Sequence, residues 1–258
     1  MGKKQIEFAN YVIIGDVHCH PDHNNDRLRL VGNYINYHKP NYVVQVGDFE
    51  DFHSLSSYDV GKKSHEGARY WRDVESVIDG QEELFKPIKK TIRDNIDWFL
   101  LGGNHGEGRI SKALNNNAQM EELLSIEHCR YDEFGWKYQK YNEILDLNGI
   151  FFTHHFNSGN MGKALATENL GKAILERKGG SGFCGHSHLR RLVSRTTPSG
   201  LHQLAGDVGC LMDYEVSYMP KECQEQWARG ILILKNVRGA DIQDFEWVSL
   251  ETLNREYN

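Results

Sequence analysis

Five short segments of this sequence place metal-binding side chains directly after a run of apolar residues. In the first, residues 11–20, the run ends at Gly15 and is followed by Asp16 and His18. The other four segments offer the following side chains: Asp48; Asn104 and His105; His154 and His155; His186 and His188. Carboxylate oxygen, amide oxygen and imidazole nitrogen form a ligand set that suits divalent transition metals.

A single Asp-x-His pair would be weak evidence for a metal site, because a buried Asp or His more often satisfies a backbone group or caps a helix. The five segments carry more weight together. An open α/β sheet gathers the carboxyl ends of its strands at one crevice, where ligands bind. The repeated pattern therefore predicts one metal site built from five strand ends.

The apolar runs that precede these side chains predict buried β-strands. They occupy residues 11–14, 42–46, 98–101, 150–153 and 183–184. Between the first two runs, Leu28, Val31 and Ile35 recur at helical spacing, and Pro40 follows them. A helix that ends before Pro40 would make these two strands a parallel βαβ unit with a right-handed crossover.

The same spacing predicts helices in the middle of the chain. Residues 64–95 are typical of two helices broken near Asp79 and Gly80, with Pro87 in or near the first turns of the second. Another helix is expected over residues 110–124, with the polar residues 115–117 inside it or interrupting it.

The second half of the chain is expected to be richer in strands. Residues 138–147 predict a strand that Asn148 and Gly149 turn back into residues 150–153 as a hairpin. A helix is expected over residues 161–178. After His188 we expect short strands that complete a second sheet packed on the first. These strands are residues 191–195, 201–205, 230–235 and 242–248. A loop is expected at residues 206–209.

Length and composition predict one soluble globular domain over residues 1–258, with a helical insertion at about 61–96. The chain is 39% hydrophobic and 26% charged, and no apolar run approaches the ~20 residues that span a bilayer. Five cysteines without a C-x-x-C pair indicate neither a disulfide framework nor a zinc knuckle. The net charge of −6 argues against binding nucleic acid by overall charge. Residues 1–10 contain no hydrophobic segment, so we expect no secretory signal and a cytoplasmic protein.

The order GDVHCH, GDFED, GGNH, THH and GHSH resembles the calcineurin-like metallophosphoesterase superfamily, whose pattern is D-x-H, G-D, G-N-H, H and G-H-x-H. The resemblance extends from Asp16 to His188 and includes all five blocks. It implies an α/β fold in which a two-sheet β-sandwich is flanked by helices. It is a poor guide to the substrate, because one catalytic platform serves phosphatases, nucleases, nucleotidases and diesterases.

The resemblance also implies a site with two divalent metal ions. Asp48 would bridge the ions, and the outer ligands would be Asp16, His18 and His188 for one ion and Asn104, His154 and His186 for the other. His154 aligns with the family ligand, while His155 remains the alternative. These ligands favour Mn, with Fe, Zn, Co or Mg as alternatives. A metal-bound hydroxide would then attack the phosphoester.

His105 matches the catalytic histidine of the family, which can protonate the leaving oxygen. In many relatives an acidic residue follows this histidine and orients its ring, whereas Gly106 follows it here. The orienting role would then pass to Glu107, to a more distant carboxylate, or to no residue.

The substrate is expected to be a phosphodiester, which would make the protein a nuclease or a nucleotide diesterase. Phe52 stands where Ser/Thr protein phosphatases carry an arginine, and Arg190 and Arg191 follow His188 directly. These two arginines and Arg109 are candidate substrate-binding residues, with a solvated basic rim as the alternative reading, above all for Arg109. The expected partner is a nucleic acid, a nucleotide or another phosphoester. The alternatives are a protein or nucleotide phosphatase and, less favoured, a metal-free binding scaffold.

Overall fold

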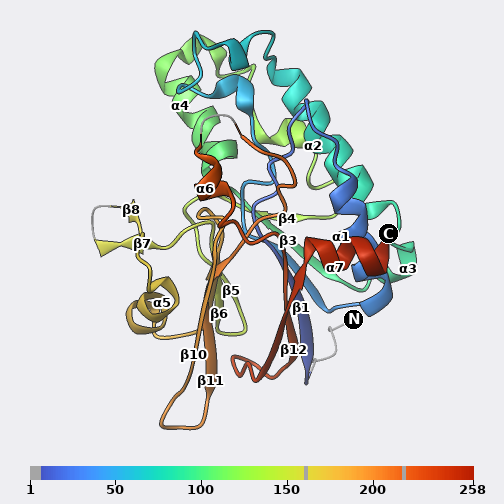
Figure 1. Ribbon diagram of the computed structural model, residues 1–258, viewed down its shortest axis with the longest axis vertical. Helices are drawn as coiled ribbons and strands as arrows, with labels where there is room; N and C mark the ends of the chain where they lie inside the picture. The colour runs from blue at the N-terminus through green and yellow to red at the C-terminus, as the bar shows by residue number, and fades with distance from the viewer. Residues whose placement is uncertain (1–6, 160–161, 217–218) are drawn as a thin grey trace.

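Two β-sheets pack face to face, and helices cover the outer face of each (Figure 1). This arrangement comes from a computed structural model that describes residues 7–159, 162–216 and 219–258. It confirms the expected α/β fold, with two mixed sheets flanked by helices. Within these residues, no helix is both long and apolar enough to cross a membrane.

The first sheet has six strands in the order β13-β12-β1-β2-β3-β4. Strands β1 to β4 run parallel, whereas β12 pairs antiparallel with both β1 and β13. Their bounds are Ala9–Ile14 (β1), Tyr42–Gln45 (β2), Asp97–Leu101 (β3), Lys137–Gln139 (β4), Gly230–Val237 (β12) and Asp244–Ser249 (β13).

The second sheet has five strands in the order β10-β11-β9-β6-β5. Leu147 pairs with Ile150 across the turn at Asn148 and Gly149, so the predicted hairpin is confirmed. The bounds are Leu145–Leu147 (β5), Ile150–Phe152 (β6), Gly182–Cys184 (β9), Arg190–Thr196 (β10) and His202–Val208 (β11). A separate pair is formed by Asn157–Ser158 (β7) and Lys163–Ala164 (β8).

The hydrophobic core follows the alternation of side chains along the strands. In β1, Tyr11 and Ile13 point between the two sheets, whereas Val12 and Ile14 pack on the helical side. That side is covered by α1 (Asp26–His38), α2 (Tyr70–Phe85) and α7 (Leu250–Tyr257), and the second sheet is covered by α5 (Leu170–Lys178). Burial on both faces explains the continuous apolar run of β1.

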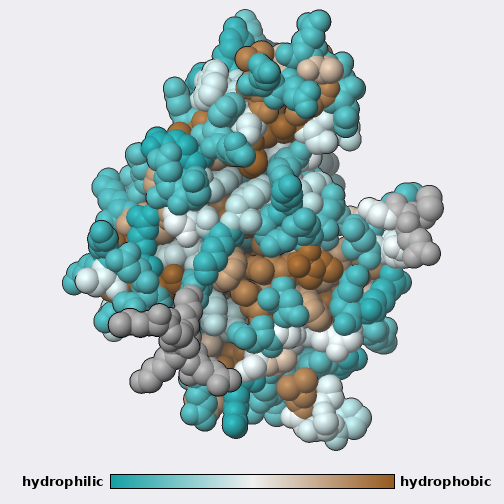
Figure 2. All heavy atoms as spheres, turned by 180° about the vertical axis from the view of Figure 1, so that it is seen from behind, coloured by the Kyte–Doolittle hydropathy of each residue, from teal (hydrophilic) through white to brown (hydrophobic). Residues whose placement is uncertain are grey.

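The remaining helical segments are short and lie mostly in loops. They are α3 (Lys90–Arg93), α4 (Arg109–Asn116), α6 (Lys221–Gln224), 3₁₀ turns at His53–Leu55, Lys63–His65, Ala118–Met120 and Ile126–Cys129, and a π-helical turn at Asn104–Gly108. Seen from behind, the surface is mainly hydrophilic, with hydrophobic side chains gathered near its centre (Figure 2).

The predicted helix break near Asp79 and Gly80 is wrong, because α2 continues through both residues to Phe85. A β-carbon on Gly80 would lie 2.5 Å from the Sγ atom of Cys19. Glycine is therefore present so that α2 can approach the loop after β1, and the helix instead ends just before Pro87.

The sequence predicted that all the strands at the end of the chain would join the second sheet, and this prediction is wrong for two of them. Only β10 and β11 do so, while β12 and β13 extend the first sheet because β12 pairs with β1 along its length. The expected strand over residues 138–147 is also divided, with β4 in one sheet and β5 in the other.

Two other expectations need correction. The helix predicted over residues 161–178 begins only at Leu170, because β8 precedes it, and residue 161 lies outside the described residues. The expected loop at residues 206–209 belongs largely to β11, whose last residue is Val208.

Candidate metal centre

The five segments singled out in the sequence meet at one end of the two sheets. Asp16 and His18 follow β1, Asp48 follows β2, and Asn104 follows β3. From the second sheet, His154 follows β6, and His186 and His188 follow β9. The first two loops are joined by backbone hydrogen bonds, because the amides of Val17 and His18 both donate to the Asp48 carbonyl at 2.9 Å.

Asp16, His18 and His188 form the first group of potential ligands. The Nε2 atoms of His18 and His188 lie 3.2 Å apart, and the Oδ2 atom of Asp16 lies 3.1 Å from His188 Nε2 and 3.9 Å from His18 Nε2. All three side chains are buried. These are the outer ligands expected for one ion.

Asp48, His154 and His186 form the second group, and Asn104 joins it. The Oδ1 atom of Asn104 lies 2.8 Å from both His154 Nε2 and His186 Nδ1. His155 belongs to none of the potential metal-binding groups found among the described residues. The geometry thus places His154, rather than His155, with the other expected ligands.

Asp48 lies between the two groups. Its Oδ2 atom is 3.2 Å from His154 Nε2 and 3.9 Å from His18 Nε2, and its Oδ1 atom accepts a hydrogen bond from the His105 amide at 2.8 Å. A carboxylate in this position can contribute to two ions at once. The arrangement is consistent with a dinuclear His/Asp site.

The donor atoms themselves fit metal ions. His154 Nδ1 lies 3.1 Å from the Val46 carbonyl, which favours a proton on Nδ1 and leaves the Nε2 lone pair facing Asp48 and Asn104. Lone pairs that converge in a buried space repel one another unless a cation lies between them. The mixture of imidazole, carboxylate and amide donors suits Mn, Fe, Zn or Co.

Nearby carboxylates raise the pKa values of two of these histidines, whereas burial lowers the pKa of His186. Burial alone would lower the pKa of His18, but hydrogen bonds to Asp16 and Asp51 and the charge of Asp48 raise it to about 10. Burial is likewise outweighed at His154, where the charge of Asp48 raises the pKa to about 9. Burial would raise the pKa of Asp48, but His154, His105 and His18 hold it well below its usual range. The carboxylates therefore attract cations, whether protons or metal ions.

The backbone at several candidate ligands is strained. Four of them have positive φ angles: 50° at His18, 51° at Asp48, 70° at His186 and 60° at His188. Such conformations cost ~1–3 kcal/mol each in non-glycine residues and cluster at functional sites. The chain thus holds these side chains in place at a cost in stability.

Close approach requires glycine beside two of the carboxylates. A β-carbon on Gly103 would lie 2.8 Å from the Cγ atom of Asp48, and one on Gly185 would lie 3.1 Å from the Cγ atom of Asp16, with a carboxylate oxygen nearer still in each case. The glycines in GGNH and GHSH therefore make room for ligands that come from other segments.

Asp51 is the carboxylate that contacts His105. Its Oδ1 atom lies 2.5 Å from His105 Nδ1, and Glu107 instead accepts a hydrogen bond from the Tyr141 amide. Asp51 also lies 3.2 Å from His18 Nδ1, so it joins the catalytic candidate to the first ligand group. Of the options left open by the sequence, the structure supplies the more distant carboxylate.

Gly106 has a packing role that the sequence did not reveal. A β-carbon on Gly106 would overlap the side chain of Glu50, at 2.5 Å from its Cδ atom and nearer still to Oε1. Glu50 is fully buried and accepts a hydrogen bond from the Tyr131 hydroxyl. Burial raises the pKa of Glu50 to about 8.

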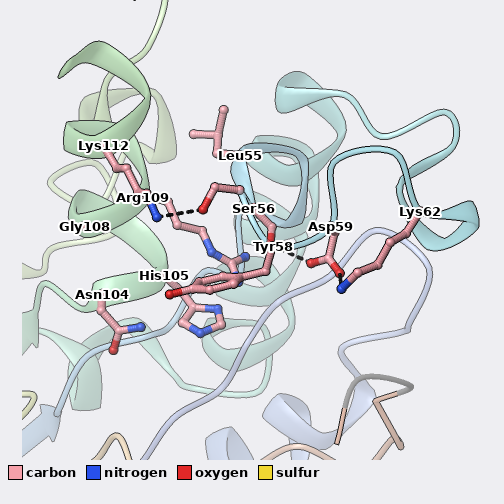
Figure 3. A pocket seen from close by; sticks show the side chains of 11 residues that line it. Leu55, Ser56, Tyr58, Asp59, Lys62, Asn104, His105, Gly108, Arg109 and Lys112 are labelled. Atoms are coloured by element: carbon pink, nitrogen blue, oxygen red, sulfur yellow. Dashed lines mark hydrogen bonds and ion pairs between the residues drawn. The ribbon is translucent and has the colours of Figure 1, made fainter. Parts of the chain in front are cut away.

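The three candidate substrate arginines lie in different surroundings. Arg109 lines a cavity beside His105, and its Nη1 atom donates to the Asp51 carbonyl and lies 3.3 Å from Asp51 Oδ1 (Figure 3). Arg191 is held by Asp207, through Nε at 3.1 and 3.2 Å, and by the Thr167 carbonyl at 2.9 Å. Arg190 packs over the Trp247 ring, 5.0 Å from its centroid. Arg191 is thus occupied within the protein, whereas Arg190 is exposed.

The sequence reasoning missed a further grouping beside the first ligands. His20, Asp51 and His53 offer donor atoms within 4.8 Å of one another and are partly exposed. Asp51 lies three residues after Asp48 and in the same GDFED block, so its position was the one available signal. The fully buried Phe52 supplies no charge to the site.

Comparisons with known proteins give distant structural matches only. No family model matches the sequence, and no curated protein matches it. One crystal structure shares 9% identity with a TM-score of 0.43, covering 94% of this chain and 99% of its own. A 5′-nucleotidase precursor from Thermus thermophilus shares 12% identity with a TM-score of 0.36, and the match covers 93% of this chain and 53% of that chain. An NAD nucleotidase from Haemophilus influenzae shares 11% identity with a TM-score of 0.37, and the match covers 96% of this chain and 61% of that chain. This chain therefore spans between 53% and 61% of the two nucleotidases.

The resemblance noted in the sequence is confirmed by the arrangement of the residues that carry it. All five blocks end at one site, and their Asp and His side chains form two clusters that are competent to bind metal. The two-sheet architecture that the resemblance implied is also present.

Proposed function

We propose that this protein is a dinuclear metal-dependent phosphoesterase of the calcineurin-like type. The observation that carries the proposal is the position of Asp48, which lies between two groups of ligands while its Oδ1 atom holds the amide of His105. Asp16, His18 and His188 would hold one ion, and Asn104, His154 and His186 the other, with Asp48 shared. When bound, the ions supply Lewis acidity and lower the pKa of a water molecule.

The protein residues would position the ester and move one proton. The nucleophile would be hydroxide, formed when the water loses a proton to solvent. As the hydroxide oxygen bonds to phosphorus, the bond from phosphorus to the leaving oxygen breaks, and that oxygen needs a proton. His105 can give it from Nε2 when both ring nitrogens carry protons, because the Asp51 carboxylate beside Nδ1 stabilises that form, although burial lowers the pKa of His105. General-acid catalysis of this kind typically contributes roughly 10²–10⁴-fold.

A phosphodiester is the preferred substrate class. A diester carries one negative charge at the reacting phosphate, whereas a monoester can carry two. The cations beside the site are partly neutralised, since Arg109 pairs with Asp51 and Arg191 with Asp207. Phe52 adds none, so the charge balance favours the singly charged ester. Monoester hydrolysis is the alternative.

Metal analysis and hydrolysis assays on one protein preparation test this proposal. We expect about two divalent ions per chain, loss of hydrolysis after chelation, and recovery when Mn²⁺ is added back. Fe²⁺, Zn²⁺, Co²⁺ and Mg²⁺ added in parallel identify the best metal. Hydrolysis that continues unchanged through the chelation cycle would overturn the proposal.

The same metal-loaded sample decides between the two ester classes. We expect faster cleavage of bis(4-nitrophenyl) phosphate than of 4-nitrophenyl phosphate, which share one leaving group. The reverse order would leave the phosphoesterase proposal in place and assign the protein to the monoesterases.

A further inference from the structure

A cavity of about 470 Å³ opens directly beside the catalytic candidate His105 (Figure 3). Asn104 and His105 form one end of it, and its walls come from helix α4 and from the loop that follows Asp51. The wall residues that matter here are Tyr58, Lys62, Arg109 and Lys112.

The position of this cavity relates it to one part of the substrate. Under the proposed function, His105 gives its proton to the leaving oxygen, so that oxygen must lie within hydrogen-bond distance of the ring. The group attached to that oxygen extends away from the metal ligands. The cavity beside His105 is the space in which this leaving group can lie.

Tyr58 gives the cavity an open aromatic surface. The side chain extends from the loop toward α4 and His105 (Figure 3), and the residue is 79% exposed. The Nζ atom of Lys112 lies 5.0 Å from the Tyr58 ring centroid and donates to the Ser57 hydroxyl at 2.7 Å. Lys112 therefore supports one face of the ring, and the rest of the ring is free to stack on a planar group.

The cations that line the cavity differ in whether a carboxylate lies beside them. Lys62 lies 3.1 Å from Asp59 Oδ1, and Arg109 lies 3.3 Å from Asp51 Oδ1. Among residues 7–159, 162–216 and 219–258, no carboxylate lies within 4.0 Å of Lys112 Nζ. Of the three cations Lys62, Arg109 and Lys112, Lys112 is thus the one whose charge no described carboxylate neutralises, so it can neutralise a ligand.

We infer that the cavity is the binding site of the leaving group, and that it takes a planar ring bearing a further phosphate, as in the next nucleotide of a phosphodiester chain. The inference rests on the proposed function, because the cavity is assigned to the leaving group only if His105 protonates the leaving oxygen. Tyr58 stacks on the base, and Lys112 binds the additional phosphate. Both residues set specificity and take no part in proton transfer.

Equilibrium binding of thymidine 3′,5′-bisphosphate to the metal-loaded protein tests the cavity without relying on turnover. Tyr58→Ala and Lys112→Met should each raise the Kd about tenfold, which corresponds to ~1.4 kcal/mol, within the range of one base–aromatic stack. Tyr58→Phe should bind as the original protein does, because it keeps the ring.

Two matched variants control for loss of an exposed tyrosine or lysine elsewhere. Tyr37 is 73% exposed on α1, and Lys172 is exposed on α5. Tyr37→Ala and Lys172→Met should change the Kd less than twofold. Equal Kd values for Tyr58→Ala, Lys112→Met and these controls would overturn the inference.

Hydrolysis of dinucleoside phosphates tests the role of Tyr58 in turnover. Two abasic isomers of thymidylyl-thymidine, each lacking one base, keep the reacting phosphate unchanged. The isomer whose released hydroxyl product lacks a base should show about tenfold lower kcat/KM, and Tyr58→Ala should remove this difference.

The outcomes separate the inference from the proposed function. If bis(4-nitrophenyl) phosphate is cleaved with metal but both abasic isomers react equally, the inference is wrong and the function stands. If no phosphoester is cleaved, the proposed function is wrong, and the bisphosphate binding data still decide whether Tyr58 and Lys112 form a ligand site.

Discussion

Replacing Gly106 with alanine should destabilise the protein although the new side chain is a single methyl group. The β-carbon would lie 2.5 Å from Glu50 Cδ and 3.0 Å from Glu50 Cγ. Glu50 is fully buried and holds the Tyr131 hydroxyl, so it cannot move into solvent without losing that hydrogen bond.

The expected cost follows from two effects. Overpacking a filled core typically costs ~1–3 kcal/mol, and leaving a buried polar group unpaired costs a further ~1–3 kcal/mol. Alanine has less conformational entropy than glycine in the unfolded chain, which raises the free energy of unfolding by ~0.4–1 kcal/mol. The net loss in free energy of unfolding should be about 1–5 kcal/mol, measured by urea denaturation of metal-loaded protein.

Gly108 provides a control within the same π-helical turn. A β-carbon there would meet the Asn104 Cβ atom at 3.4 Å, and the residue has φ −61° and ψ −45°, which alanine adopts readily. Gly108→Ala should leave the free energy of unfolding unchanged or raise it by up to ~1 kcal/mol.

Making Gly106→Ala in a protein that also carries Glu50→Ala tests whether contact with Glu50 causes the loss of stability. Glu50→Ala removes the Cγ, Cδ and Oε1 atoms that the new methyl group would meet, so Gly106→Ala should cost at least ~1 kcal/mol less in that background. If Gly106→Ala costs no more than Gly108→Ala, or costs the same with and without Glu50, the packing argument is refuted.

Three further predictions concern the metal site and the core. Asp48→Asn should reduce the metal content at both positions, because the Asp48 carboxylate contacts both ligand groups. His105→Ala should keep the metals and lower kcat roughly 10²–10⁴-fold. Loss of metal from His105→Ala would show that His105 is a ligand. Gly185→Ala should lower the metal affinity of the first group, because its β-carbon would displace the Asp16 carboxylate, and titration of the apoprotein checks this. Phe183→Ala, between the sheets, should cost ~3–5 kcal/mol of stability in urea without changing the metal content of the folded protein.

Much of the fold and the candidate site could be predicted because the information was local. The apolar runs that became β1, β2, β3, β6 and β9 are each mostly buried, and each run is visible in a few neighbouring residues. The side chains that follow these strands have metal-binding chemistry whatever the fold. Parallel strands bring their carboxyl ends to one edge of a sheet, which predicts that side chains within one sheet meet. The packing of the two sheets then brings His154, His186 and His188 beside the ligands of the first sheet.

Other features depended on contacts between segments that are distant in the sequence. Gly80 looked like a helix break, because only the packed structure shows the Cys19 sulfur that occupies the space of its missing β-carbon. Strand β12 looked like part of the second sheet, because its apolar pattern does not say which edge it will pair with. Backbone hydrogen bonds to β1 decided this.

The partner of His105 shows the same division most clearly. The sequence determined that a histidine stands beside Asn104 and that Gly106, not an acidic residue, follows it. Only the tertiary structure showed that Asp51, 54 residues away, lies 2.5 Å from its Nδ1 atom and that Glu107 turns to Tyr141 instead. Sequence composition and period determine which face of an element is buried, but the direction of a polar side chain depends on the positions of all its neighbours, which the folded chain alone defines.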